Sequence, residues 1–257
     1  MTTTQRAHFL APDGLRVPAV SVAEMREVDR IAIEATGPSL LQLIELAGQQ
    51  VALAAIDLLG ERWPGARAVV LCGSGRNGAT GVCAARHLAN RGIRVEVITI
   101  VPPQRADGAL GESFLALAEA PARVTRWDEA FDVTAADIVI DAVLGCRLTG
   151  EPQPVQRGLI LAAGAAAEAG VPVLSIDVPS GLDADDGTAP GAVVRPTRTV
   201  TLGLPKRGLT HDNAGDLWVA DLGIPPGVFA RAGVAFAPFF GAASCVPLAY
   251  PPPPDAG

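Results

Sequence analysis

The stretch AVVLCGSGRNGATG, residues 68–81, decides the fold class of this 257-residue chain. Its first part, Ala68–Cys72, is a short apolar run, which is typical of a parallel strand buried on both faces. Glycines then follow at positions 73, 75, 78 and 81, and we expect a helix over Ala79–Asn90 that closes at Gly92. A strand, a glycine-rich turn and a helix in this order predict one strand-and-helix step of a parallel sheet.

The same alternation continues outward from this stretch. Before it, Ser21 with Glu24 is a capping-box pattern that opens a helix through about Ala35, and Ser39 caps a second helix that runs to Gly60. After it, we expect strands at 94–100, 137–141, 173–177 and 197–203, an edge strand at 216–220, and helices at 108–118 and 155–169. Strands and helices that alternate with short links predict an α/β protein with an open, mostly parallel sheet covered on both faces.

Length and composition favour one globular domain. A chain of 257 residues lies within the range of a single α/β domain and can bury a large core. Hydrophobic residues make up 49% and charged residues 18%, which argues against disorder. We expect the domain at 18–238, with extended or loosely ordered tails at 1–17 and 239–257, because both ends are polar or rich in proline.

Charge and hydropathy exclude several classes of partner. A net charge of −7 disfavours nucleic-acid binding, which needs a basic surface. No apolar run approaches the roughly 20 residues that span a bilayer, and Pro12, Asp13 and Gly14 interrupt the apolar core that a secretory signal would need. We therefore expect a cytoplasmic protein with no nucleic-acid or membrane partner.

The cysteines and histidines give a zinc site little support. The four cysteines are scattered without a Cys-x-x-Cys pair, and no two of the three histidines are spaced i,i+4. We expect small buried thiols instead. Of the 20 basic residues, only Lys206 is a lysine. Because arginine can neither deprotonate nor act as a compact point charge, Lys206 is a candidate functional residue.

The glycine-rich turn matches the G-x-G-x-x-G pattern of dinucleotide-binding loops over residues 73–78. Backbone amides in such a turn can approach an anion, and the following helix N-terminus favours negative charge. The pattern also requires an acidic residue at the end of the next strand, about 20 residues on. That strand ends at Thr99–Pro102 with Glu96 in its middle, so an ordinary dehydrogenase is disfavoured.

Two aspartates, Asp141 and Asp177, end successive apolar strands, and each is followed by a glycine-containing loop. Ligands of open α/β sheets bind at the carboxyl ends of the strands. Either aspartate alone could simply cap a turn or helix. Two neighbouring carboxylates, however, repel each other unless a cation or a shared proton intervenes. A metal ion held by oxygen ligands fits this arrangement, and so does an acid/base group beside a charged ligand.

Several segments, in this order, resemble the YjeF N-terminal domain family, the NAD(P)H-hydrate epimerases, from about Val22 to Pro226. The most specific is Asp177-Val-Pro-Ser-Gly-Leu-Asp183 with Gly187, followed by Thr199-Val-Thr-Leu-Gly-Leu-Pro-Lys206 with Gly208. The others are Val22-Ala-Glu-Met-Arg26 with Asp29, Leu43-Ile-Glu-Leu-Ala-Gly48, Asn77-Gly78, Ala84-Ala-Arg-His-Leu88 and Val219–Pro225.

The resemblance implies a three-layer αβα, Rossmann-like sandwich, usually a homodimer, that interconverts the R and S forms of hydrated NADH and NADPH. Asp177 and Lys206 match the catalytic acid/base candidates. A potassium ion is implied at residues matching Asn77, Asp141 and Ser180. The implied contacts of the nucleotide substrate are Gly75, Arg76, Asn77, Gly78, Ala79, Thr80, Gly145, Cys146, Arg147, Leu148 and Asp177. A separate dehydratase is the expected pathway partner.

Departures from the family pattern keep other functions open. Ala79 and Thr80 stand where the family has glycine and aspartate, Cys146 and Arg147 replace its Thr-Gly, and Leu46 replaces an asparagine. We expect the Ala79 methyl to restrict backbone that approaches a ligand. Besides an active epimerase, the alternatives are a divergent binding or scaffold module on the same fold and an enzyme for another metabolite, whose anionic group Arg147 would meet.

Overall fold

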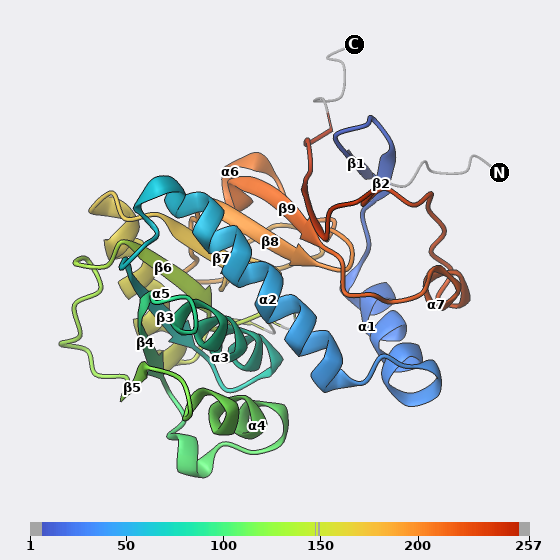
Figure 1. Ribbon diagram of the computed structural model, residues 1–257. Coiled ribbons are helices and arrows are strands. Elements are labelled where there is room, and N and C mark those ends of the chain that lie inside the picture. Colours follow the sequence, from blue (N-terminus) through green and yellow to red (C-terminus); the bar gives the residue numbers. More distant parts are fainter. Residues whose placement is uncertain (1–6, 147, 149, 252–257) are drawn as a thin grey trace.

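The computed structural model describes residues 7–146, 148 and 150–251. Its main sheet consists of β3 (Arg67–Cys72), β4 (Arg94–Thr99), β5 (Ala122–Arg126), β6 (Ile138–Ala142), β7 (Val173–Ile176), β8 (Arg198–Leu202), β9 (Asp216–Ala220) and β10 (Cys245–Pro247). The strands lie in the order β10-β9-β8-β7-β6-β3-β4-β5, and all neighbours are parallel except β10, which pairs antiparallel with β9 (Figure 1). The predicted α/β class with a mostly parallel sheet is confirmed.

Helices cover both faces of this sheet, so the fold has three layers with the sheet in the middle. The longer ones are α1 (Val22–Ile31), α2 (Leu40–Leu59), α3 (Arg76–Ala89), α4 (Gly108–Leu117) and α5 (Pro154–Glu168), and α6 (His211–Ala214) and α7 (Pro226–Arg231) are short. Alternate residues of β3 enter two different cores, as the pleat of a strand requires. Val70 packs with α2 and α3 on one face, whereas Val69 packs with Leu159 of α5 on the other.

The two N-terminal helices begin where the sequence predicts. Ser21 and Glu24 form a capping box, in which each side chain accepts a hydrogen bond from the backbone N–H of the other residue. Ser39 and Gln42 form a second one at the start of α2. A π-helical turn, η1 (Ala32–Thr36), continues α1. α2 and α3 pack so closely at Gly48 that a Cβ there would lie 2.6 Å from the Cys83 Sγ.

One helix departs from the expectation drawn from hydropathy. Leu40–Arg62 is long and apolar enough to cross a membrane by length and composition, with a mean hydropathy of 1.4 in its most apolar window. More than half of that window is buried inside the protein, where α2 packs against α3 and contributes Ala47, Val51 and Ala55 to the core. Core helices of globular proteins pass the same test, and α2 packs as such a helix.

Within the described residues, 7–17 and 239–251 are more ordered than we expected from the sequence. Strands β1 (His8–Leu10) and β2 (Arg16–Pro18) form an antiparallel hairpin, and Leu10 also bridges to Ala249 near the other end of the chain (Figure 1). Phe9, Val17 and Val246 are buried. Three-residue strands carry too little periodicity to stand out in a sequence, so this order comes from burial against the main sheet.

The edges of the sheet also differ from expectation. Residues 216–220 were expected to form an edge strand, but β10 covers β9, and β5 forms the opposite edge. β5 lacks the apolar run of a buried strand, and its residues Arg123, Val124 and Arg126 are exposed. The chain adds β4 and β5 on one side of β3 and then returns to place β6 on the other. This reversal makes the carboxyl ends of β3 and β6 the place where an open α/β sheet binds its ligand.

Candidate functional site

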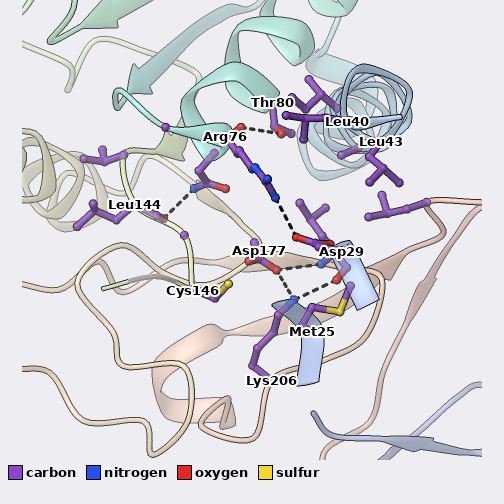
Figure 2. Close-up of a pocket in the computed structure, with 18 of the residues that line it drawn as sticks. Met25, Asp29, Leu40, Leu43, Arg76, Thr80, Leu144, Cys146, Asp177 and Lys206 are labelled. Carbon is purple, nitrogen blue, oxygen red and sulfur yellow. Dashed lines mark hydrogen bonds and ion pairs between the residues drawn. The ribbon is translucent and has the colours of Figure 1, made fainter. Parts of the chain in front are cut away.

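A pocket of about 390 Å³ opens at the carboxyl ends of β3 and β6 (Figure 2). One wall is apolar and consists of Met25, Leu40, Leu43, Ile44, Ala47 and Leu222. The rest is formed by Asp29, Ser74, Gly75, Arg76, Asn77, Thr80, Val143, Leu144, Gly145, Cys146, Gln156, Asp177, Leu202 and Lys206. A concave, largely apolar space with a few converging polar groups is the usual form of a small-molecule site.

The glycine-rich turn after β3 contacts the loop after β6, and both loops line the pocket. Gly73 donates its N–H to the carbonyl of Ala142 at 3.0 Å, and a Cβ at Gly73 would lie 1.9 Å from the carbonyl oxygen of Val143. Only glycine allows the loops after β3 and β6 to touch in this way. α3 begins at Arg76, three residues earlier than predicted, and no side chain caps its first turn. Ser74, Gly75, Arg76 and Asn77, around the start of this helix, line the pocket.

Asp177 and Lys206 form an ion pair at the floor of the pocket. Lys206 is 1% exposed and also donates to the carbonyl of Leu202 at 3.0 Å and to the Thr201 hydroxyl at 3.4 Å. The Leu202 N–H donates to the same Asp177 oxygen that binds Lys206. Among the described residues, Asp177 is the only non-glycine with a positive φ, at 67°. Backbone held in this sparsely populated region is typical of functional sites.

Asp141 lies beneath the pocket and is fully buried. Its carboxylate accepts hydrogen bonds from the Ser175 hydroxyl at 2.8 Å and from the Ser180 hydroxyl and N–H at 2.5 and 2.9 Å. Burial raises the pKa of Asp141, and the hydrogen bonds from Ser180 and Ser175 oppose that rise. No cationic side chain of the described residues forms an ion pair with this carboxylate.

Asn77 and Ser180 hold the same backbone segment from opposite sides. The Asn77 amide donates to the Leu144 carbonyl at 2.8 Å, and the Leu144 N–H donates to the Ser180 hydroxyl at 2.8 Å. The structure thus brings together Asn77, Asp141 and Ser180, which the resemblance grouped as cation ligands. Their oxygens and the Leu144 carbonyl form a donor set of the kind that hard cations prefer.

The mouth of the pocket is crossed by an ion pair between two helices. Arg76, the first residue of α3, donates to Asp29 of α1 at 3.1 Å (Figure 2). Thr80 lies one turn further along α3, is 3% exposed, and donates to the Arg76 carbonyl. Cys146 lies beside Asp177, and burial together with this carboxylate raises the pKa of its thiol to about 12. Its thiol therefore stays protonated at neutral pH.

Some residues expected to contact the substrate lie elsewhere. Gly78 and Ala79 are buried inside α3, away from the pocket surface. The expected restriction at Ala79 is wrong, because its backbone is helical and its methyl belongs to the hydrophobic core. Leu148 does not line the pocket, and Arg147 lies outside the described residues.

The apolar wall and Asp29 were absent from the predicted site. Met25, Asp29, Leu43 and Ile44 come from the two N-terminal helices, whereas the site residues predicted from the sequence follow the strand ends. The signal was present, since Val22–Arg26 with Asp29 and Leu43–Gly48 are both segments of the family resemblance. They became site residues only when α1 and α2 packed beside the strand ends.

A second polar cluster, outside the pocket, contains residue types that can bind a metal, although the spacing of the cysteines and histidines predicted no zinc site. Ligand atoms of Glu45, Cys83 and His87 all lie within 4.8 Å of one another. Cys83 and His87 share one face of α3 at i,i+4 spacing, which a search for paired cysteines or paired histidines misses. Arg86 already donates to both Glu45 oxygens at 2.6 and 2.7 Å. A cationic side chain therefore already lies at the centre of this cluster.

Comparisons with known proteins agree with the resemblance. A model of the family described as YjeF-related protein N-terminus matches residues 40–208. An NAD(P)H-hydrate epimerase from Dehalogenimonas lykanthroporepellens is 42% identical over 229 residues, which cover 88% of this chain and 90% of that protein. A second NAD(P)H-hydrate epimerase, from Weissella koreensis, is 33% identical and covers 80% of this chain and 91% of that protein.

Longer proteins and a solved structure extend this comparison. The bifunctional NAD(P)H-hydrate repair enzyme Nnr of Hyperthermus butylicus is 41% identical over 74% of this chain, which spans 36% of that protein. The crystal structure of the yeast protein ynu0 superposes with a TM-score of 0.79, covers 90% of this chain and all of that one, and is 24% identical, so it shows a shared fold. The chain belongs to the YjeF-related protein N-terminus family.

Proposed function

We propose that the protein is an NAD(P)H-hydrate epimerase, which interconverts the R and S forms of hydrated NADH and NADPH. The observation that carries this proposal is the Asp177–Lys206 pair at the floor of a largely apolar pocket. Relatives named for this activity are 33–42% identical over most of the chain. The same pair lies in the two most specific segments of the family resemblance.

The reaction inverts one hydrated carbon, so protons must move around its hydroxyl group and the ring nitrogen. Asp177 offers a carboxylate that can accept a proton inside the pocket. Lys206 holds one oxygen of that carboxylate and is itself held by two further acceptors, which keeps the acid in one orientation. The apolar wall of Met25, Leu40 and Leu43 excludes water from one side of the ring.

A coupled assay tests the activity directly. The R hydrate is the substrate, and a dehydratase specific for the S form reports each epimerisation. We expect the wild-type protein to accelerate the coupled reaction above spontaneous epimerisation and Asp177→Ala to abolish the acceleration. If wild type gives no acceleration but the Ala79→Gly/Thr80→Asp variant does, the divergent binding module becomes the better description.

We also propose that Asn77, Asp141 and Ser180 hold a potassium ion. The residues fit this group because Asp141 is a fully buried carboxylate without an ion pair among the described residues, and such a charge is costly without a compensating cation. When bound, the ion would supply positive charge beneath the substrate. Potassium chloride should raise the melting temperature of wild type above that in choline chloride of equal ionic strength, and Asp141→Asn should remove the difference. Equal melting temperatures in the two salts would contradict the proposal.

The proposals about oligomeric state, pathway partner and cellular location rest on the same family. A homodimer is proposed and would give twice the chain mass of 26.3 kDa in light scattering. The bifunctional relatives are consistent with a dehydratase as the pathway partner. A cytoplasmic location is proposed and is tested by cell fractionation.

A further inference from the structure

A second hollow adjoins the pocket across the Arg76–Asp29 ion pair. This hollow, the α1 pocket, has a volume of about 480 Å³ and is lined by α1 and η1 residues and by Arg76. Arg76 and Asp29 line both spaces. The ion pair is therefore a shared wall, and parting it would join the two spaces.

We propose that the α1 pocket holds the adenosine half of the substrate and that Arg26 there gives a preference for the 2′-phosphorylated hydrate, that of NADPH. This inference rests on the proposed function. A dinucleotide consists of two nucleotide halves joined by a pyrophosphate. If its reacting half lies against Asp177 and Lys206, the other half leaves through the mouth, where Arg76 stands. Beyond that point lies the α1 pocket.

One of the three arginines that line the α1 pocket is left to bind an anionic ligand. Arg30 is held by Glu27 at 2.8 Å and by Glu34 at 3.3 Å, and Arg76 is held by Asp29. Arg26 is exposed and forms no hydrogen bond or ion pair within the described part of the chain. It is the arginine in this pocket whose charge is left to meet a ligand.

A fourth arginine adds to this balance from another element. The hydrogen bond from Arg30 holds the pKa of Glu27 below its usual range, and the charge of Arg231 on α7 acts in the same direction. The lining carries three arginines (Arg26, Arg30 and Arg76) and three carboxylates (Glu27, Asp29 and Glu34), and Arg231 adds a positive charge from outside the lining. Arg26, which no carboxylate of the described residues holds, suits a phosphate monoester, because the planar guanidinium is a preferred partner of phosphate. Arginine is also the residue that accommodates the 2′-phosphate in dinucleotide-binding α/β folds.

The test compares the two substrates in one protein. R-NADPH hydrate and R-NADH hydrate are assayed with wild type, Arg26→Gln and Arg62→Gln. Arg62 is an exposed arginine at the far end of α2, outside both spaces, and its variant controls for the loss of one charge. An exposed pair is worth up to about 1 kcal/mol, so we expect wild type to favour the NADPH hydrate about fivefold in kcat/KM. Arg26→Gln should remove this preference through KM for the NADPH hydrate, and Arg62→Gln should keep it.

Binding of stable probes separates this inference from the proposed function. NADP⁺ should stabilise wild type against heat more than NAD⁺ does, and only Arg26→Gln should make the two shifts equal. If wild type epimerises both hydrates equally well, or if Arg26→Gln weakens both alike, the inference is overturned and the epimerase activity stands. If neither hydrate is epimerised, the proposed function fails, and equal stabilisation by NADP⁺ and NAD⁺ would then overturn the inference as well.

Discussion

Replacing Lys206 with methionine tests how strongly the floor of the pocket depends on its buried ion pair. Methionine keeps a long, unbranched side chain but carries no ammonium group. Lys206 is 1% exposed, and the Asp177 side chain is 11% exposed, so water replaces the lost partner only in part. Removing one member of a buried ion pair costs about 3–5 kcal/mol of unfolding free energy. The Leu202 N–H still donates to Asp177 at 3.3 Å, which favours the lower end, about 3 kcal/mol.

Urea unfolding at neutral pH measures this cost, and a double-mutant cycle with Asp177→Asn assigns it to the pair. We expect the sum of the two single losses in unfolding free energy to exceed the loss in the double variant by about 1–3 kcal/mol. The reason is that the second change removes a group that has already lost its partner. Leu88→Met is the matched control, since Leu88 is fully buried in α3 and this volume-conserving change should cost less than about 1.5 kcal/mol.

Epimerase kinetics give the second measurement on the same proteins. Each single variant should lower kcat by about a hundredfold or more. The kcat of the double variant should be no lower than that of the less active single variant. The reasoning is refuted if Lys206→Met costs less than about 1 kcal/mol. It is also refuted if the single costs add to within about 0.5 kcal/mol, because the two side chains would then act independently.

Three further predictions address the surroundings of the site. Gly73→Ala should cost about 1–3 kcal/mol in urea unfolding, because its Cβ would lie 1.9 Å from the Val143 oxygen, whereas Gly164→Ala, in open space on α5, should stabilise by about 0.5–1 kcal/mol; a harmless Gly73→Ala would contradict this. Burial lowers the pKa of His87 below 6.5, so stability should be fully present above pH 6.5 and fall as pH drops below it, and His87→Gln should flatten that slope; an unchanged slope would exclude His87 as its source. Because the pKa of Cys146 is raised to about 12, native protein should react with maleimide at neutral pH about a thousandfold more slowly at this thiol than unfolded protein does, as followed by mass spectrometry of the labelled peptide, and equal rates would show an exposed thiolate.

Several features follow from local sequence alone. The alternation of strands and helices, the capping boxes at Ser21 and Ser39, and the glycine turn at 73–81 depend on contacts within a few residues, so their patterns predict structure directly. Asp141 and Asp177 were expected at one edge of the sheet because parallel strands end at the same edge. The structure places them there, with Asp141 in β6 and Asp177 directly after the neighbouring strand β7.

Other features depend on packing between distant segments, which no local pattern specifies. Arg76 and Asp29 are 47 residues apart in the sequence and meet only because the folded chain brings α1 close to the start of α3. The apolar wall from α2 forms by the same packing. The hairpin at the N-terminus and β10 are too short to be recognised before the two chain ends are brought together. The central strands and the two aspartates at their carboxyl ends could thus be read from the sequence, because periodicity and spacing are local. The edge strands and the pocket around those aspartates depend on contacts between segments far apart in the chain, so only the folded structure reveals them.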